Sequence, residues 1–282
     1  MHIDTHSYSS MQSSILKYLN VKQEDMAAML VLANEKANTG LATNEAALKK
    51  DFDEFLNSHS PSEKIDEILF FHLSRRLNSD KNLCVGNNLF DLLTKESVLS
   101  SFLKKHEIIF GAEEKRLDLY YKDKEVCLDK VHESNVSYLR NRLGYNKGRE
   151  DYCINGFAFR DLLFKNDYSR RLEDVPEFIG ALACFLNCKK VGTDYYKNSQ
   201  YYCLEYCIPL DKVKFDDDEN LTLEQKEKFF LNKVLYRLYE YFFSNVEFMH
   251  DNDNPVLRLA DFDTMTENYF VTREKITYEM LK

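Results

Sequence analysis

The chain of 282 residues is long enough for one large domain or two unequal ones. Hydrophobic residues make up 44% of the sequence and charged residues 30%, which is enough to bury a core and keep the chain in solution. The formal net charge of -9 argues against a nucleic-acid backbone as the main partner, because phosphate groups are bound by basic surfaces.

The cysteines and the N-terminal sequence bear on the compartment. Seven cysteines are an odd number, and no basic or cleavable signal segment precedes them, so we expect reduced thiols in the cytoplasm. The serine-rich leader at residues 1–19 would also suit an effector that enters a host cell without a Sec-type signal peptide. No run approaches the ~18 apolar residues of a membrane-spanning helix, so we expect no such span.

The first 60 residues predict a helical N-terminal subdomain. Apolar residues recur at helical spacing over 13–19 and 23–36, and a third helix starts at Thr43–Glu45. The Ser-His-Ser-Pro-Ser stretch at 58–62 interrupts this pattern, because proline and serine favour turns. We therefore place a subdomain boundary at this stretch.

Residues 61–220 predict an α+β core, and residues 221–282 predict a C-terminal helical segment. A short apolar run favours a buried strand at Ile65–Arg76, with a helix from Ser62 as the alternative. The later elements, in chain order, are a helix at 87–105, a strand at 107–110, a hairpin at 116–128, a helix at 137–143, a turn at Asn155–Gly156, a helix at 177–186, a strand at 201–209 and a long helix at 222–243. The expected fold is a small mixed or split β-sheet with flanking helices.

Two polar residues on the predicted strands are candidates for a site. His72 ends the first apolar run, where it can donate to a ligand hydroxyl or bond a backbone carbonyl in a structural role. Strand alternation places Glu205 on one face with Cys203 and Cys207. Because carboxylates are seldom buried unless they are paired or used, this face borders a cleft or an ion pair. The alternative is an exposed glutamate on an edge strand.

Metal sites are not expected. The spacing of Cys184 with Cys188, and of Cys203 with Cys207, resembles that of a zinc site. However, four residues of strand span ~13 Å, whereas zinc needs each sulfur within ~2.3 Å. The acidic residues of the hairpin at 116–128 suggest a metal-dependent nuclease only faintly. The sequence contains no P-loop, no dinucleotide glycine fingerprint, no Gly-x-Ser-x-Gly and no His-Glu-x-x-His motif.

The order of the candidate residues resembles that of a known superfamily. His72 lies on an early strand, a Gly-Phe-Ala-Phe sequence follows at 156–159 with Tyr168 behind it, and Glu205 lies on a late strand. This order resembles the His-Tyr-Glu branch of the ADP-ribosyltransferase superfamily. The resemblance covers about residues 65–215.

The resemblance implies an enzyme that uses NAD as a substrate. His72 would hold the NAD ribose, and Glu205 would orient the ribose or the acceptor. Tyr168 or Phe159 would stack on the nicotinamide, in an aromatic wall that also includes Phe157. A carboxylate beside the developing oxocarbenium charge would assist cleavage of the bond to nicotinamide.

The other branch of this superfamily combines an arginine, a serine motif and a glutamate. Arg75, or its neighbour Arg76, would stand for this arginine and contact NAD. The Ser-Thr-Ser strand of that branch is not visible in the sequence.

Three functions follow from these alternatives. The first is an ADP-ribosyltransferase or NAD glycohydrolase that acts as a bacterial toxin, effector or defence protein on a macromolecular target. The second is a non-catalytic protein-binding module with an aromatic cleft, which docks through the helical ends at 13–58 and 222–243. The third is a metal-dependent nuclease. A protein target or inhibitor is the expected partner, ahead of nucleic acid.

Overall fold

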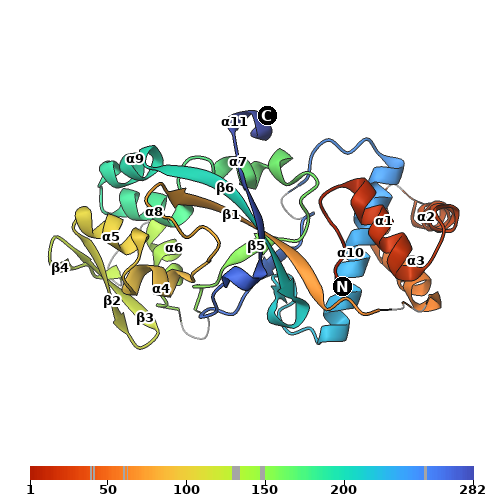
Figure 1. The fold of residues 1–282 in the computed structure, drawn as a ribbon, viewed down its shortest axis with the longest axis horizontal. Coiled ribbons are helices and arrows are strands. Elements are labelled where there is room, and N and C mark those ends of the chain that lie inside the picture. The colour runs from red at the N-terminus through yellow and green to blue at the C-terminus, as the bar shows by residue number, and fades with distance from the viewer. Residues whose placement is uncertain are drawn as a thin grey trace. The chain divides into compact units, whose positions relative to one another are not determined.

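The computed structural model describes residues 1–38, 40, 42–59, 61, 63–128, 134–146, 150–250 and 253–282 (Figure 1). Small sheets flanked by helices confirm the predicted α+β class. The chain divides into two compact units, and neither is continuous in sequence. Unit 1 comprises residues 1–70, 157–166 and 207–257, and unit 2 comprises residues 71–156, 167–206 and 258–282.

Unit 1 is mainly helical. Its α-helices are α1 (Tyr8–Leu19), α2 (Gln23–Ala37), α3 (Glu45–Ser58) and α10 (Leu223–Phe243), and its shorter elements include the 3-10 helices η2 (Leu163–Lys165) and η3 (Leu210–Lys212). Helix α10 packs against α1 and α3, and α2 packs against α3. The N-terminal helices and the long C-terminal helix, which the sequence assigned to separate segments, therefore share one core.

Side-chain caps set the start of several helices. Helix α1 begins well before the predicted residue 13, because Ser7 rather than Ser13 caps it. The Ser7 hydroxyl accepts a hydrogen bond from the Ser10 amide, and the Ser10 hydroxyl accepts one from the Ser7 amide. Helix α10 starts as predicted, where Thr222 forms the same reciprocal cap with Gln225.

Unit 2 contains a small antiparallel sheet and most of the remaining helices. The helices are α4 (Leu89–Thr94), α5 (Val98–Lys105), α6 (Ser134–Arg142), α7 (Asp167–Arg171), α8 (Glu177–Phe185), α9 (Lys189–Lys197), η4 (Glu267–Tyr269) and α11 (Tyr278–Leu281). The sheet has the order β2 (Ile108–Glu113), β3 (Arg116–Tyr121) and β4 (Lys124–Glu125). The predicted turn at Lys122–Asp123 is present, and both residues have positive φ, which a tight hairpin requires.

A larger sheet contains the strands that carried the sequence-based site. Its order is β7 (Lys214–Phe215), β8 (Val256–Arg258), β5 (Asn155–Phe157), β1 (Glu67–Leu77), β6 (Ser199–Pro209) and β9 (Phe270–Lys275). Strands β1, β5, β6 and β8 each contribute residues to both units. The pairing of β6 with β9 is antiparallel, and it shifts between Glu205 and Tyr206 because β9 has an extra residue, Val271.

Four features differ from the sequence-based prediction. The single helix at 87–105 is two helices, because Ser97 caps a new helix instead of continuing the first. Asn155 and Gly156 lie in β5 and not in a turn. Helix α9 and strand β9 were not predicted. The three consecutive segments 1–60, 61–220 and 221–282 do not coincide with the two units, and the predicted break at 58–62 lies partly outside the described residues.

A buried ion pair fixes α10 within unit 1. Arg237 Nε donates to Asp161 Oδ2 at 2.9 Å, and the side chains of both residues are only 2% exposed. Tyr241 donates its hydroxyl to the same oxygen at 2.7 Å, and Arg237 also contacts Glu240. Because a charge left without its partner in a core is costly, this network holds α10 in one position on unit 1.

We predict that Asp161→Asn lowers the free energy of unfolding by up to about 3–5 kcal/mol, because it removes the buried carboxylate of the pair and leaves only the partly exposed Glu240 beside the Arg237 charge. Urea denaturation followed by circular dichroism measures the change. Asp217→Asn is the control, since Asp217 pairs with Lys233 at the surface and is 64% exposed. The control variant should change stability by less than about 1 kcal/mol. Equal losses in the two variants would contradict a structural role for the buried pair.

Candidate functional site

The pairing of β1 with β6 decides which candidate residues can meet. At one end the Leu210 amide donates to the Asp66 carbonyl at 2.8 Å, and at the other end the Asn78 amide donates to the Asn198 carbonyl at 2.8 Å. Both bonds belong to one antiparallel register, in which each step along β1 matches one step back along β6. This register places Leu204 directly opposite His72.

The register sorts the candidates onto two faces of the sheet. Residues directly opposite each other share a face, and successive residues of a strand alternate between faces. His72 therefore shares a face with Leu204, which we call the His72 face. Glu205 and Arg75 lie on the opposite face, which we call the Glu205 face. The structure does not bring the side chains of His72 and Glu205 to one side of the sheet.

His72 has the structural bond that was the alternative in the sequence analysis. Its Nδ1 lies 2.7 Å from the carbonyl oxygen of Asn155, which can only accept, so Nδ1 carries the proton and Nε2 is left as an acceptor. Burial, followed by the charge of Arg76, lowers the pKa of His72 to about 4, against the raising effect of the Asn155 bond. The ring is therefore neutral at pH 7 and can accept from a ligand hydroxyl on its own face.

Arg75 is held by the protein itself. Its Nε donates to the Ser199 hydroxyl at 2.9 Å, and its guanidinium also donates to the Glu173 carbonyl. The same group lies 4.4 Å from the ring centroid of Tyr196. Burial lowers the pKa of Arg75. These contacts leave little of the guanidinium for the contact with NAD that the resemblance implies.

Glu205 is a buried carboxylate on an inner strand. Its side chain is 8% exposed, and its strand has β1 on one side and β9 on the other, where Thr272 is opposite. The alternative of an exposed glutamate on an edge strand is therefore wrong. Tyr201 and Cys203, which share the Glu205 face, are also buried. The extra residue at the bulge lies in β9, so the alternation along β6 is uninterrupted.

The three aromatic candidates do not have equal access to a ligand. Phe159, in unit 1, is fully buried, and the side-chain amide of Asn254 both accepts from its backbone amide and donates to its carbonyl. Phe157, in unit 1, is 7% exposed. Tyr168, in unit 2, lies on α7 and is 37% exposed. Among these aromatic residues Tyr168 is the one whose ring is open to solvent.

Unit 2 also contains a cleft of about 1050 Å³ that sequence reasoning missed. Residues of α5, α9 and the turn after β1 line it, and we call it the α5–α9 cleft. Its polar side chains include two lysines, a histidine, two carboxylates and several hydroxyl or amide groups: Lys105, Lys190, His106, Glu96, Asp194, Ser97, Ser101, Asn78 and Asn198. The sequence contained no signal for this cleft, because α9 was not predicted and the lining residues are far apart in the chain.

One ion pair and one aromatic contact shape this cleft. His106 Nε2 lies 3.6 Å from Asp194 Oδ2, and its ring centroid lies 4.9 Å from that of Phe102. Lys105 and Lys190 are exposed at the ends of two different helices, so their ammonium groups are available to a ligand.

We predict that the His72 pKa makes folding stability depend on pH between about 6.5 and 4. In this range the unfolded chain takes up a proton that folded His72 does not, so the stability present above pH 6.5 is lost as the pH falls. His72→Asn retains a donor for the Asn155 carbonyl and does not titrate. The urea midpoint should therefore fall less from pH 7 to pH 5 for the variant than for the wild type. An equal fall in both would mean that His72 titrates normally in the folded protein.

Comparisons with models of protein families, with curated proteins and with solved structures give no match for this chain. The ADP-ribosyltransferase resemblance therefore rests on His72, Tyr168 and Glu205 alone.

Proposed function

We propose that the protein binds a small anionic ligand in the α5–α9 cleft of unit 2. The observation that carries this proposal is the presence of Lys105 and Lys190, from two different helices, in the lining of one cleft. Two ammonium groups that line one concave surface can provide charge-assisted hydrogen bonds to phosphate or carboxylate oxygens. Serine and asparagine side chains beside them suit the hydroxyl groups of a sugar or nucleotide.

The charge of the whole chain makes this pair of lysines more significant. With a formal net charge of -9, most of the surface repels anions. Glu96 and Asp194 also line the cleft, but Asp194 pairs with His106. Two lysines from different helices in one cleft of an acidic protein favour a small anion over a long polyanion such as nucleic acid.

NAD is the first ligand to test, because it carries a diphosphate and is the substrate that the resemblance implies. A second candidate function, cleavage of NAD by an ADP-ribosyltransferase-like toxin, effector or defence protein, is favoured by one observation. Glu205 is a buried carboxylate, 8% exposed, on the same face of β6 as the buried Tyr201 and Cys203. Such a group suits stabilisation of positive charge that develops on a ribose. The register leaves His72 out of this site.

The compartment and the partner are also proposals. We infer that the protein acts in the cytoplasm, or in a host cell that it enters without a Sec-type signal peptide, and that it meets a protein target or inhibitor there. None of the seven cysteines forms a disulfide in the structure, which supports a reducing compartment. No helix in the described part of the chain has the length and apolar character needed to cross a membrane.

We predict that replacing both cleft lysines, in Lys105→Ala/Lys190→Ala, weakens binding of NAD, ADP-ribose or pyrophosphate by roughly 10-fold or more, since each charge-assisted hydrogen bond contributes about 1.5–3 kcal/mol. Isothermal titration calorimetry measures the affinity, and binding to the wild type should weaken as salt is added. The matched control is Lys104→Ala/Lys189→Ala, which removes the same charge from the same helices outside the cleft lining. Equal losses in both double variants, or binding of none of the three probes, would overturn the proposal.

For NAD cleavage we predict that Glu205→Gln lowers nicotinamide release by roughly 100-fold or more, as loss of a charge-stabilising group does in other enzymes. His72→Asn should leave the rate within roughly threefold, because His72 lies on the opposite face of the sheet. Glu274→Gln, an exposed glutamate on the neighbouring strand, is the control. The absence of turnover by the wild type, or an equal loss in the His72 variant, would count against a site on the Glu205 face.

A further inference from the structure

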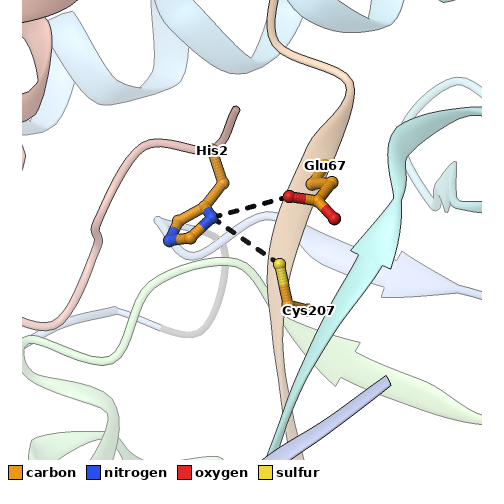
Figure 2. A group of neighbouring side chains, drawn as sticks. All are labelled: His2, Glu67 and Cys207. Carbon is orange, nitrogen blue, oxygen red and sulfur yellow. Dashed lines mark hydrogen bonds and ion pairs between the residues drawn. The ribbon is translucent and has the colours of Figure 1, made fainter. Parts of the chain in front are cut away.

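Three potential metal ligands, His2, Glu67 and Cys207, lie together in unit 1, and Glu67 and Cys207 come from the same face of β1 and β6 as Glu205. His2 Nδ1 lies 3.6 Å from Cys207 Sγ and 3.9 Å from a carboxylate oxygen of Glu67 (Figure 2). One ligand atom from each residue lies within 4.8 Å of the other two. Figure 2 shows the imidazole, the thiol and the carboxylate directed toward one space beside β1 and β6.

The sheet brings two of these ligands together. Glu67 begins β1 and Cys207 lies near the end of β6. The register places Pro209 opposite Glu67, so Cys207 is the diagonal neighbour of Glu67 on the same face. The two side chains are therefore held at a fixed separation by backbone hydrogen bonds, independently of any ion.

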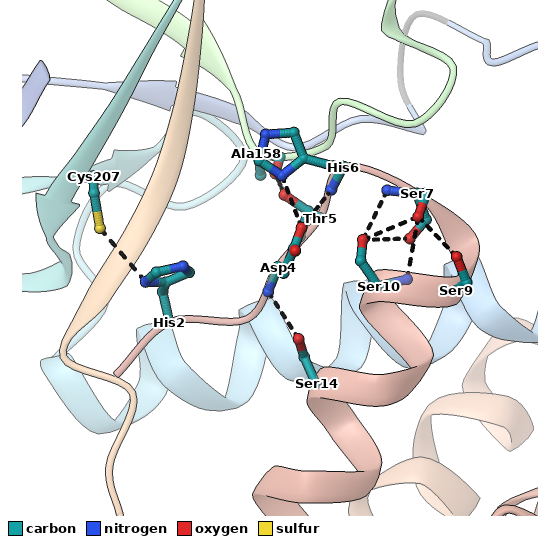
Figure 3. Close-up of polar contacts among 10 residues, drawn as sticks. All are labelled: His2, Asp4, Thr5, His6, Ser7, Ser9, Ser10, Ser14, Ala158 and Cys207. Carbon is teal, nitrogen blue, oxygen red and sulfur yellow. Dashed lines mark hydrogen bonds and ion pairs between the residues drawn. The ribbon is translucent and has the colours of Figure 1, made fainter. Parts of the chain in front are cut away.

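Backbone contacts hold the third ligand in place. The Met1 carbonyl accepts hydrogen bonds from the amides of Asp66 at 3.2 Å and Glu67 at 3.4 Å, which places His2 beside Glu67. Further along the same segment, the Thr5 hydroxyl donates to the Ala158 carbonyl at 2.6 Å, and the Asp4 amide donates to the Ser14 hydroxyl at 3.1 Å (Figure 3). The N-terminal segment is thus anchored on both sides of His2.

We propose that His2, Glu67 and Cys207 bind a zinc ion. In a tetrahedral site, Zn–S of ~2.3 Å and Zn–N of ~2.0–2.1 Å place the sulfur and the nitrogen roughly 3.5 Å apart. The observed separation of Cys207 Sγ and His2 Nδ1 is 3.6 Å. The Glu67 oxygen is slightly farther than a bound ligand would be, and its side chain is 47% exposed and therefore able to move.

The chemistry of the three ligands selects zinc over the common hard cations. Magnesium and calcium take oxygen ligands, whereas a thiolate with an imidazole is typical of zinc. With three protein ligands, a water molecule fills the fourth position, as in zinc sites that are open to solvent. The partial exposure of His2 and Glu67 gives this water a route to the ion. Binding would link the N-terminal segment to β1 and β6.

A titration of the metal-free full chain with Zn²⁺ tests this proposal. Isothermal titration calorimetry follows the binding, and any purification tag is removed completely beforehand. We expect one equivalent of zinc and a rise in melting temperature. Co²⁺ in place of zinc should give the visible absorption of a tetrahedral thiolate site. Cys207→Ser and His2→Ala should each weaken zinc binding by roughly 100-fold or more, and Cys207→Ser should abolish the sulfur-to-cobalt band.

Two control variants remove the same kinds of side chain elsewhere. Cys184→Ser removes an exposed free thiol, and His6→Ala removes a histidine of the same N-terminal segment that bonds Asp4. Both should retain zinc affinity within roughly threefold of the wild type. If the wild type does not bind zinc, or if the controls lose as much affinity as Cys207→Ser, the three residues form only a hydrogen bond and an ion pair. Circular dichroism of each metal-free variant separates loss of the site from loss of the fold.

Discussion

The antiparallel pairing of β1 with β6 is the constraint on which the rest of the interpretation depends. Each strand has 11 residues, and backbone hydrogen bonds at both ends keep a single register. Because side chains alternate strictly along a strand, this register decides the neighbours of every residue. It places Arg75 with Glu205, separates both from His72, and sets Glu67 beside Cys207. A slip of one residue would reverse all of these assignments.

The local sequence pattern was sufficient to predict most of the helices and strands. The apolar run of β1, the long amphipathic stretch of α10 and the turn at Lys122–Asp123 are each determined by neighbours in the sequence. The prediction of one continuous helix at 87–105 was wrong, and the reason is also local. Ser97 can either continue a helix or cap a new one, and only its hydrogen bonds with Ser100 decide between the two.

The relations between distant segments could not be predicted in the same way. Strand alternation left open whether Glu205 is buried or exposed, because its surroundings depend on partner strands far away in the chain. The α5–α9 cleft needs α9, which was not predicted, and the zinc ligands need the anchoring of residue 1 by β1. In each case a few backbone hydrogen bonds bring together side chains that no sequence spacing relates.

Strand β9 has a consequence for the behaviour of the protein in concentrated solution. It forms one edge of the larger sheet, so among the described residues no strand pairs with the other side of its backbone. An exposed edge of this kind can pair with the same edge of another molecule and start aggregation. The extra residue Val271 disrupts the regular spacing of hydrogen-bonding groups, and three consecutive charged residues follow it: Arg273, Glu274 and Lys275. The irregular, charged edge therefore disfavours strand-to-strand association between copies of the chain.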